Sequence, residues 1–374
     1  MSTGRGAGQE TRVRLADGRE IIYFDDTPGH HRTARDERVL EACRPRSEIR
    51  YDPVLDEWVI IAAHRQVRTN LPATGECPLC PSRAGRPSEI PAQDYHVVAF
   101  ENRFPSLAAH HEPGSGEGPA GTTRPATGRC EVVCFTSDHH GSFADLPPSR
   151  LGTVARAWVH RTLELSRLPG VEYVFVFENR GPEIGATLQH PHGQIYAYPF
   201  VPPRTARALE SARRWRAAHG GCLCCVLVAD ESREGTRVIA ETDDFVAFVP
   251  AAARWPYEVY LYPRRHVPDL PALSEGEIGR AMLLYAEVLR RFDALFGRPL
   301  PYVASWHQAP VRVDRDLAHL SLQIFTPRRA SHRLKYLAAS ESGVGAFVND
   351  VLPEDAAARL RGSTGADGHQ PSRS

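Results

Sequence analysis

The stretch that decides the fold runs from residue 190 to residue 199 and reads HPHGQIYAYP. We interpret it as a β-strand, in which residues two positions apart face the same way. His190, His192 and Gln194 then share one face, and the residues between them lie on the other. A neutral imidazole is a competent nucleophile toward phosphorus, provided that its second nitrogen keeps its proton against a fixed acceptor. The alternative is a pair of structural histidines on an edge strand.

The second half of the chain repeats segments of the first half in the same order. The segment HLSLQIFTP (319–327) matches HPHGQIYAYP, YVASWHQAP (302–310) matches YVFVFENRG (173–181), and CLCC (222–225) matches CPLC (77–80). Two further strand segments and a helix also match in the same order. We therefore predict an α+β fold in which duplicated units form one extended antiparallel sheet flanked by helices. The alternative is a chance similarity within a single unit.

Composition limits the classes of protein to consider. The chain has 374 residues, and its 45 basic and 45 acidic residues give zero net charge, which argues against a dedicated nucleic-acid binder. No apolar run is long enough for a transmembrane helix, and the N-terminus lacks the apolar stretch of a secretory signal. We expect a cytoplasmic protein without a membrane or nucleic-acid partner.

The predicted organisation has four parts. Residues 1–48 are polar and Arg-rich and are expected to be a loosely ordered, possibly disordered extension. Residues 49–203 form the first repeat, which begins with a hairpin that turns at Asp52-Pro53, and residues 204–352 form the second. Residues 353–374 are a polar tail. Helices are expected over 147–168, 204–219 and 276–296.

The residues FENRG (177–181) followed by HPHGQIYAYPF (190–200) resemble the signature of galactose-1-phosphate uridylyltransferases, in the histidine-triad superfamily. The resemblance covers roughly residues 49–350. It implies a homodimer of duplicated histidine-triad-like units in which only the first keeps the nucleophile, and Ser321 indeed stands where His192 stands. It also implies ping-pong transfer of UMP from UDP-glucose to galactose 1-phosphate through a uridylyl group on His192, with Gln194 bonded to the transferring phosphate.

Further substrate-binding residues are predicted along the chain. The segment 179–187 alone reads as an ordinary Gly-Pro loop, but next to the HPHGQ strand it can donate hydrogen bonds to phosphate from its amide, its backbone and its hydroxyl. The resemblance adds two arginines, a loop that meets the ribose, and a C-terminal segment that reaches the hexose across a dimer interface. Arg103 stands where Asp is common, and Ser340 where Tyr is frequent. The candidates are Asn179, Gly185, Ala186, Thr187, Arg65, Arg68, Asn102, Arg103, Lys335, Tyr336 and Glu341.

Two sets of residues suit zinc, which prefers four nitrogen or sulfur ligands. The first contains Cys77, Cys80 and His190, and the family resemblance adds His139, with His140 a rival for it; a redox pair or free thiols is the alternative. The repeat predicts a second set, Cys222, Cys225, His266 and His319, with Cys224 a rival thiol and four unrelated residues as the alternative.

Other family members carry an iron-type site. The matching positions here are Ala208, His307, Leu322 and Ile324, which retain one ligand, so no iron site is expected.

Two rival functions remain open at this point. One is a related nucleotidyltransferase or phosphorylase that uses ADP-glucose or another sugar nucleotide. The other is a zinc-stabilised nucleotide-binding module without turnover, which would leave His192 idle.

Overall fold

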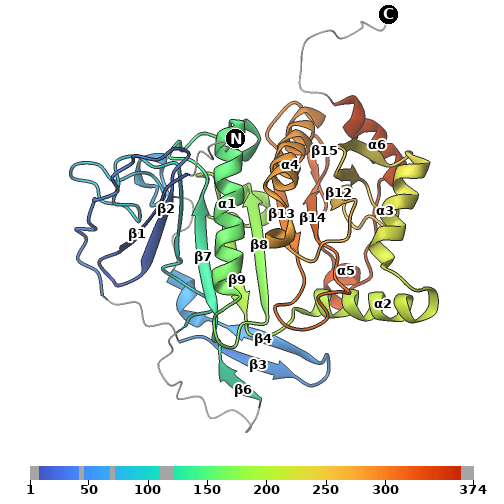
Figure 1. Ribbon diagram of the computed structural model, residues 1–374, viewed down its shortest axis with the longest axis horizontal. Coiled ribbons are helices and arrows are strands. Elements are labelled where there is room, and N and C mark those ends of the chain that lie inside the picture. Colours follow the sequence, from blue (N-terminus) through green and yellow to red (C-terminus); the bar gives the residue numbers. More distant parts are fainter. Residues whose placement is uncertain (1–7, 42–45, 68–71, 110–121, 364–374) are drawn as a thin grey trace, which may run out of the picture.

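The computed structural model describes residues 8–41, 46–67, 72–109 and 122–363. Its centre is an 11-stranded antiparallel sheet in the order β1-β2-β5-β7-β9-β8-β13-β14-β12-β11-β10 (Figure 1). The strands of this sheet are β1 (Glu10–Arg14), β2 (Glu20–Phe24), β5 (Val97–Glu101), β7 (Arg129–Cys134), β8 (Tyr173–Arg180), β9 (His192–Tyr198), β10 (Val238–Glu241), β11 (Phe245–Phe248), β12 (Tyr257–Pro263), β13 (Tyr302–His307) and β14 (Ser321–Thr326). The predicted α+β class with one extended antiparallel sheet is confirmed.

The sheet is built from two matching halves that meet between β8 and β13. Outward from this seam the first half reads β8, β9, β7, β5, and the second reads β13, β14, β12, β11. Each strand therefore has its sequence counterpart at the same distance from the seam, as the matched segments predicted. The two halves are joined by ladder hydrogen bonds in which Glu178 faces Ala304 and Asn179 faces Val303.

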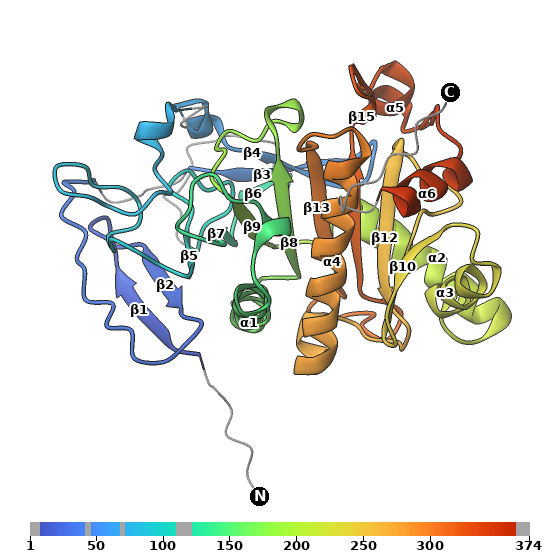
Figure 2. The same ribbon diagram turned by 90° about the horizontal axis from the view of Figure 1, so that it is seen from above.

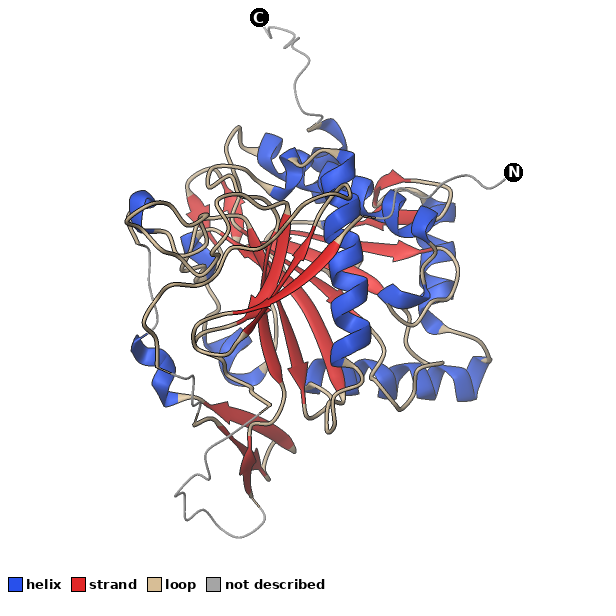
Figure 3. Cartoon of the chain, turned by 60° about the vertical axis from the view of Figure 1, so that its left-hand side comes forward, coloured by secondary structure: helices blue, strands red, loops and turns tan. Residues whose placement is uncertain are grey.

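The two long helices α1 (Pro148–Leu165) and α4 (Glu275–Leu295) cover one face of the sheet, and α3 (Leu223–Glu234) packs against the other face of β11 and β12. The predicted helices are present as α1, α2 (Pro203–His219) and α4. Helices α1 and α4 lie side by side across the sheet (Figure 1) and bury an aromatic cluster that includes Trp158, Tyr285 and Trp306. Figure 3 shows the strands of the sheet in red with a long helix lying across them. Three further helices, α3, α5 (Ala339–Val344) and α6 (Pro353–Gly362), belong to the second half. No described helix is long and apolar enough to cross a membrane.

A small sheet lies on the opposite side. It contains β4 (Glu57–Ile61), β3 (Glu48–Asp52) and β6 (Thr123–Pro125), and Figure 2 shows it across the main sheet from α1 and α4. The predicted hairpin is present, because Asp52 pairs with Glu57 across the turn. A short ribbon, β15 (Arg328–Ala330) with β16 (Arg333–Leu334), follows the main sheet.

The prediction for residues 1–48 was wrong for much of the segment. Strands β1 and β2 extend the main sheet beyond β5, and residues 21–24 are buried. Arg19 is also buried and bonds to Asp17, Glu89 and the carbonyl of Glu101. Arg12, Arg32 and Arg38 of this segment also form ion pairs. Residues 1–7 and 42–45 lie outside the described residues.

The prediction of a polar tail from residue 353 was also wrong in its first part. Residues 353–362 form α6, which buries Ala356, Ala357 and Leu360 against the core. Only three apolar side chains at helical spacing carry this contact, so the segment reads as polar by composition.

Candidate active site

Strand β9 presents its polar residues to one face. His192, Gln194 and Tyr196 are half-buried, whereas Gly193, Ile195 and Ala197 between them are buried. The predicted two-residue period is thus observed. Gly193 is required by close packing, because a Cβ at this position would lie 2.9 Å from the carbonyl oxygen of Phe177 and 2.9 Å from Cζ of Phe135.

The His192 ring is held in one tautomer. Its Nδ1 lies 2.7 Å from the carbonyl oxygen of His190, a group that only accepts, so Nδ1 carries the proton. Nε2 is then left with a free lone pair. Burial lowers the pKa of His192, although the hydrogen bond to the His190 carbonyl opposes this shift. The ring is therefore neutral near neutral pH, and its Nε2 can act as a nucleophile.

A cavity of about 250 Å³ opens in front of His192. It brings together nine of the predicted residues, and these are Arg65, Asn102, Arg103, Asn179, Gly185, Ala186, Thr187, His192 and Gln194. Arg65 is fixed in its wall by Nη1 hydrogen bonds to the Phe104 carbonyl (2.9 Å) and the Ser106 hydroxyl (2.7 Å). Arg68 lies outside the described residues.

The loop after β8 differs in detail from the prediction. A short 3₁₀ turn, η4 (Pro182–Ile184), follows Gly181 and ends at Gly185, and both glycines have positive φ. The N–H of Gly185 donates to Pro182, and the N–H of Ala186 donates to Gly181. These two backbone donors close the turn. The prediction that they would bind a phosphate was therefore wrong. The side chains of Asn179 and Thr187 still line the cavity.

Sequence reasoning missed the apolar end of the cavity. Leu79, Phe100, Val132 and Phe177 form this part of the lining, and the buried carboxylate of Glu89 lies beside them. Leu79 lies between the two predicted thiol ligands, and this position was the only feature of the sequence that could have placed it near the site. The others are single residues of ordinary buried strands, and their convergence depends on the sheet order.

The C-terminal candidates do not line this cavity within one chain. Lys335 is buried, and its Nζ donates to Glu341 at 2.9 Å and to the carbonyl oxygen of Val348. The side chain of Tyr336 is 77% exposed. Arg328, on β15, bonds to Glu183 at 2.8 Å and so ties this region to the loop beside the cavity.

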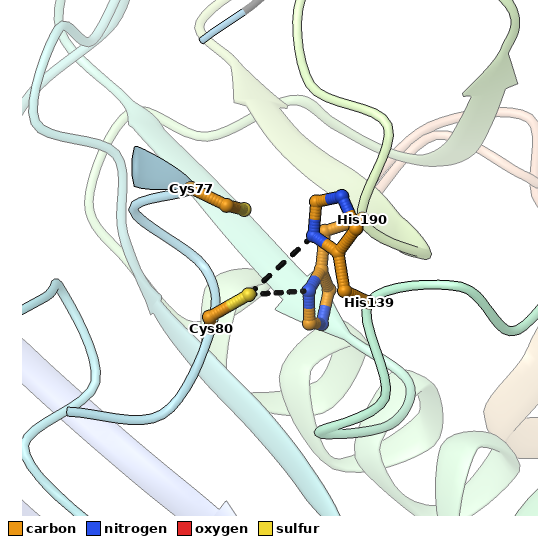
Figure 4. Close-up of side chains that lie close together, drawn as sticks. All are labelled: Cys77, Cys80, His139 and His190. Atoms are coloured by element: carbon orange, nitrogen blue, oxygen red, sulfur yellow. Dashed lines mark hydrogen bonds between the residues drawn. The ribbon is translucent and has the colours of Figure 1, made fainter. Parts of the chain in front are cut away.

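The first Cys-His set forms one cluster beside the cavity (Figure 4). Its four ligand atoms all lie within 4.8 Å of one another, with Cys80 Sγ 3.4 Å from His139 Nδ1 and 3.7 Å from His190 Nδ1. His190 Nε2 lies 2.8 Å from the Thr136 carbonyl, so that Nδ1 faces the thiols without a proton. Burial lowers the pKa of His190 to about 4, which also keeps the ring neutral. His139, and not His140, belongs to this cluster.

The second Cys-His set repeats this geometry. Cys222 Sγ and Cys225 Sγ lie 3.7 Å and 3.6 Å from His319 Nδ1, and Cys225 Sγ lies 3.9 Å from His266 Nδ1. The four ligand atoms again lie within 4.8 Å of one another. His319 Nε2 lies 3.0 Å from the carbonyl of Pro263, which matches Thr136 in the repeat. The rival thiol, Cys224, instead contacts the hydroxyl of Tyr262 at 4.0 Å.

Both clusters suit a tetrahedral ion. Bonds of about 2.3 Å to sulfur and about 2.0 Å to nitrogen place neighbouring ligand atoms roughly 3.3–3.8 Å apart. Four of the five sulfur–nitrogen distances, at 3.4–3.7 Å, fall within this spacing, and the fifth, at 3.9 Å, lies just above it. In each cluster the second ring nitrogen of one histidine bonds to a backbone carbonyl, which orients the ligand. Two thiols and two imidazoles are a metal-binding donor set.

The positions matched to the iron-type site are mostly apolar. Leu322 and Ile324 are buried in the core of β14, and Ala208 lies on α2. His307 Nε2 lies 3.1 Å from the Ser305 hydroxyl.

Comparisons with known proteins agree on one family. The family model described as galactose-1-phosphate uridyl transferase, N-terminal domain, matches residues 40–202, and that of the C-terminal domain matches residues 208–373. A galactose-1-phosphate uridylyltransferase from Streptomyces lividans is 46% identical over 369 residues, which cover 94% of this chain and 97% of the relative.

Two solved structures have similar folds. One is a uridylyltransferase, with a TM-score of 0.77 and 32% identity over 84% of this chain and 98% of its own. The other is an ADP-glucose phosphorylase from Arabidopsis thaliana with bound ADP-glucose, with a TM-score of 0.65 and 27% identity over 84% and 98% of the two chains.

Proposed function

The chain belongs to the galactose-1-phosphate uridylyltransferase family, and on this premise we propose that it transfers UMP from UDP-glucose to galactose 1-phosphate through His192. The observation that carries the proposal is the 2.7 Å contact between His192 Nδ1 and the His190 carbonyl. This contact fixes the proton on Nδ1 and leaves Nε2 facing the cavity as the nucleophile. A binding module without turnover would not need a histidine held in this tautomer.

The reaction balances in two displacements at phosphorus. In the first, His192 Nε2 bonds to the α-phosphorus of UDP-glucose while the bond to the bridging oxygen breaks, and glucose 1-phosphate leaves. In the second, a phosphate oxygen of galactose 1-phosphate attacks the same phosphorus, the bond to Nε2 breaks, and UDP-galactose leaves. The Nδ1 proton stays on the ring throughout.

The cavity residues have two tasks in this proposal. Gln194, Asn179, Thr187 and Arg65 donate hydrogen bonds to the phosphate oxygens, whose negative charge grows in the transition state. Asn102 and Arg103 also line the cavity, and in this proposal they contact the nucleoside. Because Arg103 can only donate, it uses the ribose oxygens as acceptors.

ADP-glucose is the alternative donor, since a structural relative binds it. Trapping the covalent nucleotidyl–protein adduct distinguishes UDP-glucose from ADP-glucose as the donor. Intact-mass analysis after mixing with UDP-glucose should show one added uridylyl group, and ADP-glucose should add little. His192→Ala should abolish the adduct, whereas Ser321→Ala, at the matched position of the second repeat, should retain it. Full turnover by His192→Ala would falsify the nucleophile assignment.

We further propose that both Cys-His clusters hold zinc. The donor sets and their spacing support two zinc ions per chain, and zinc supplies structural free energy by fixing each C-x-x-C segment to its strand. Elemental analysis should give close to two zinc per chain. Cys77→Ser and Cys225→Ser should each remove one, but only Cys77→Ser should also slow adduct formation, because His190 precedes the His192 strand. One zinc in the wild type, unchanged in Cys225→Ser, would contradict the second site.

A homodimer is the proposed assembly, in which Lys335, Tyr336 and Glu341 of one copy approach the cavity of the other. Their position away from their own cavity and the exposure of Tyr336 support this arrangement. Mixing His192→Ala with Lys335→Ala should restore activity through mixed dimers with one intact site. Failure of the mixture to regain activity would favour a hexose site built within one chain.

A further inference from the structure

Glu178 is a buried carboxyl group that the proposed reaction does not use. Its side chain is 5% exposed, and it forms no ion pair with a described residue. The guanidinium of Arg180, two residues along β8, bonds to Asp293 at 2.9 Å instead. A carboxyl group buried without a cation is costly, so its retention needs a reason.

Both oxygens of Glu178 accept a hydroxyl from the second repeat. Tyr302 of β13 donates to Oε1 at 2.7 Å, and Tyr285 of α4 donates to Oε2 at 2.8 Å. Both tyrosines are fully buried. Glu178 is therefore a junction through which the half without the nucleophile contacts the half that carries it.

The junction lies directly behind the proposed nucleophile. In the ladder between β8 and β9, Glu178 faces Gly193, the residue between His192 and Gln194. The neighbours of Glu178 along β8, Phe177 and Asn179, point the other way and line the cavity. Fixing Glu178 therefore fixes the stretch of β8 that places Asn179 and supports the His192 strand.

The duplication provides an internal comparison. Ser321 and Gln323 of β14 match His192 and Gln194, so Leu322 matches Gly193. The residue that faces Leu322 is Trp306, which by strand pairing holds the position of Glu178 and is buried in the apolar core. The strand pairing is thus shifted by one residue from the segment match, which aligns His307 with Glu178. The fold accepts a tryptophan at this position. The carboxyl group is present only in the half with the nucleophile.

We propose that Glu178 is a positioning residue: held by Tyr285 and Tyr302, it fixes the β8–β9 pair so that His192 and Asn179 meet the α-phosphate in register. This inference rests on the proposed function. It also assigns a task to the second repeat, which supports the reactive strand from behind. Glu178 does not touch the substrate and acts through the backbone of β8.

The protonation of Glu178 supports this role. Burial raises its pKa to about 7, although the hydroxyls of Tyr302 and Tyr285 and the charge of Arg180 oppose the shift. These three are the titratable groups that face it from β13, α4 and β8. Both hydroxyls can donate to the ionised group at once, whereas the protonated group offers a donor of its own and one lone pair fewer. The hydrogen bonds of the junction therefore favour the ionised group, whereas burial favours the protonated one.

The test compares single-turnover adduct formation from UDP-glucose in Glu178→Gln, Tyr302→Phe and the wild type. Glutamine keeps the shape but replaces one acceptor by a donor, and phenylalanine removes one hydroxyl. We expect the adduct rate of Glu178→Gln to fall about 10- to 100-fold, with the KM for UDP-glucose unchanged. Tyr302→Phe should change in the same direction by a smaller factor. The wild-type rate should also show an ionisation near pH 7 that is absent in Glu178→Gln.

Trp306→Phe is the matched control, because it disturbs the same position in the second repeat. It should lower thermal stability without lowering the adduct rate. An adduct rate of Glu178→Gln equal to the wild type overturns the inference. A similar fall in the adduct rate of Trp306→Phe also overturns the inference, since it would indicate a general loss of stability. If Glu178→Gln does not fold, Tyr302→Phe with an unchanged rate overturns it. A wild type that forms no adduct overturns the proposed function as well.

Discussion

Gly193→Ala tests how closely the His192 strand is packed. An added Cβ would lie 2.9 Å from the carbonyl oxygen of Phe177 and 2.9 Å from Cζ of Phe135, closer than real Cβ atoms approach. The carbonyl belongs to the sheet backbone and the Phe135 ring is fully buried, so neither can move cheaply. Overpacking of this kind costs about 1–3 kcal/mol. Because β9 must shift to relieve it, adduct formation should fall more than the loss of stability explains.

Gly152→Ala is the matched control. Gly152 lies inside α1, and nothing lies within 4 Å of an added Cβ there, so the substitution should stabilise the helix by about 0.5–1 kcal/mol. Urea denaturation of both variants gives the free energies of unfolding, and intact-mass analysis gives the adduct rates. A Gly193→Ala protein as stable as Gly152→Ala, with an unchanged adduct rate, would refute the argument that close packing positions His192.

Two further predictions concern buried charges and are measured by urea denaturation. Arg161 bonds to the buried Glu131 through Nε and Nη2 at 2.8 Å each, and Arg161→Met would leave Glu131, among the described residues, only its 3.1 Å bond to Arg129. We therefore expect this variant to lose stability by at most about 3–5 kcal/mol, and the added change Glu131→Gln to recover part of the loss. A double variant no more stable than the single one would contradict this reasoning. Burial raises the pKa of Glu178 from 4.5 to about 7, so the folded state binds its proton more tightly than the unfolded chain, and stability falls as pH rises through this range. The gap in unfolding free energy between the wild type and Glu178→Gln should therefore change by up to about 3 kcal/mol between about pH 5 and about pH 8, and a constant gap would show that Glu178 keeps an ordinary pKa.

Much of the fold could be predicted because it depends on local periodicity and on internal repetition. The face shared by His192 and Gln194 follows from the two-residue period of a strand. The duplication predicts that the matched strands lie in one sheet, and four of them on each side, β8, β9, β7 and β5 with β13, β14, β12 and β11, lie at matching distances from the seam. The ligands of the second cluster follow from those of the first, because matched positions in matched units meet in the same way.

What could not be predicted depends on contacts between distant segments. Strand β1 shows the alternation of an exposed edge strand, but nothing local indicates that β5 leaves an edge open for β2. Arg19 reads as surface charge until Glu89, 70 residues away, is placed beside it. The donors of Gly185 and Ala186 were misread for a different reason. A loop with two positive-φ glycines closes on itself and uses its own N–H groups, a detail that spacing does not reveal.

Both halves contain a Cys-His cluster, but only the first half contains the proposed nucleophile. The duplicated unit therefore has a structural role in both halves and a catalytic role in one. Each half must hold its C-x-x-C segment against its own sheet. His190 and His319 make the same ring-to-carbonyl contact, although only the strand after His190 carries the proposed nucleophile. Only one half must present a reactive imidazole. At the positions between the matched polar residues, the reactive half has Gly193 facing a carboxyl group, and the other half has Leu322 facing Trp306. Apolar packing is sufficient where a strand only has to be stable. Where His192 must be placed against a phosphate, the structure uses directional hydrogen bonds from Tyr285 and Tyr302, which fix orientation more tightly than apolar contact can.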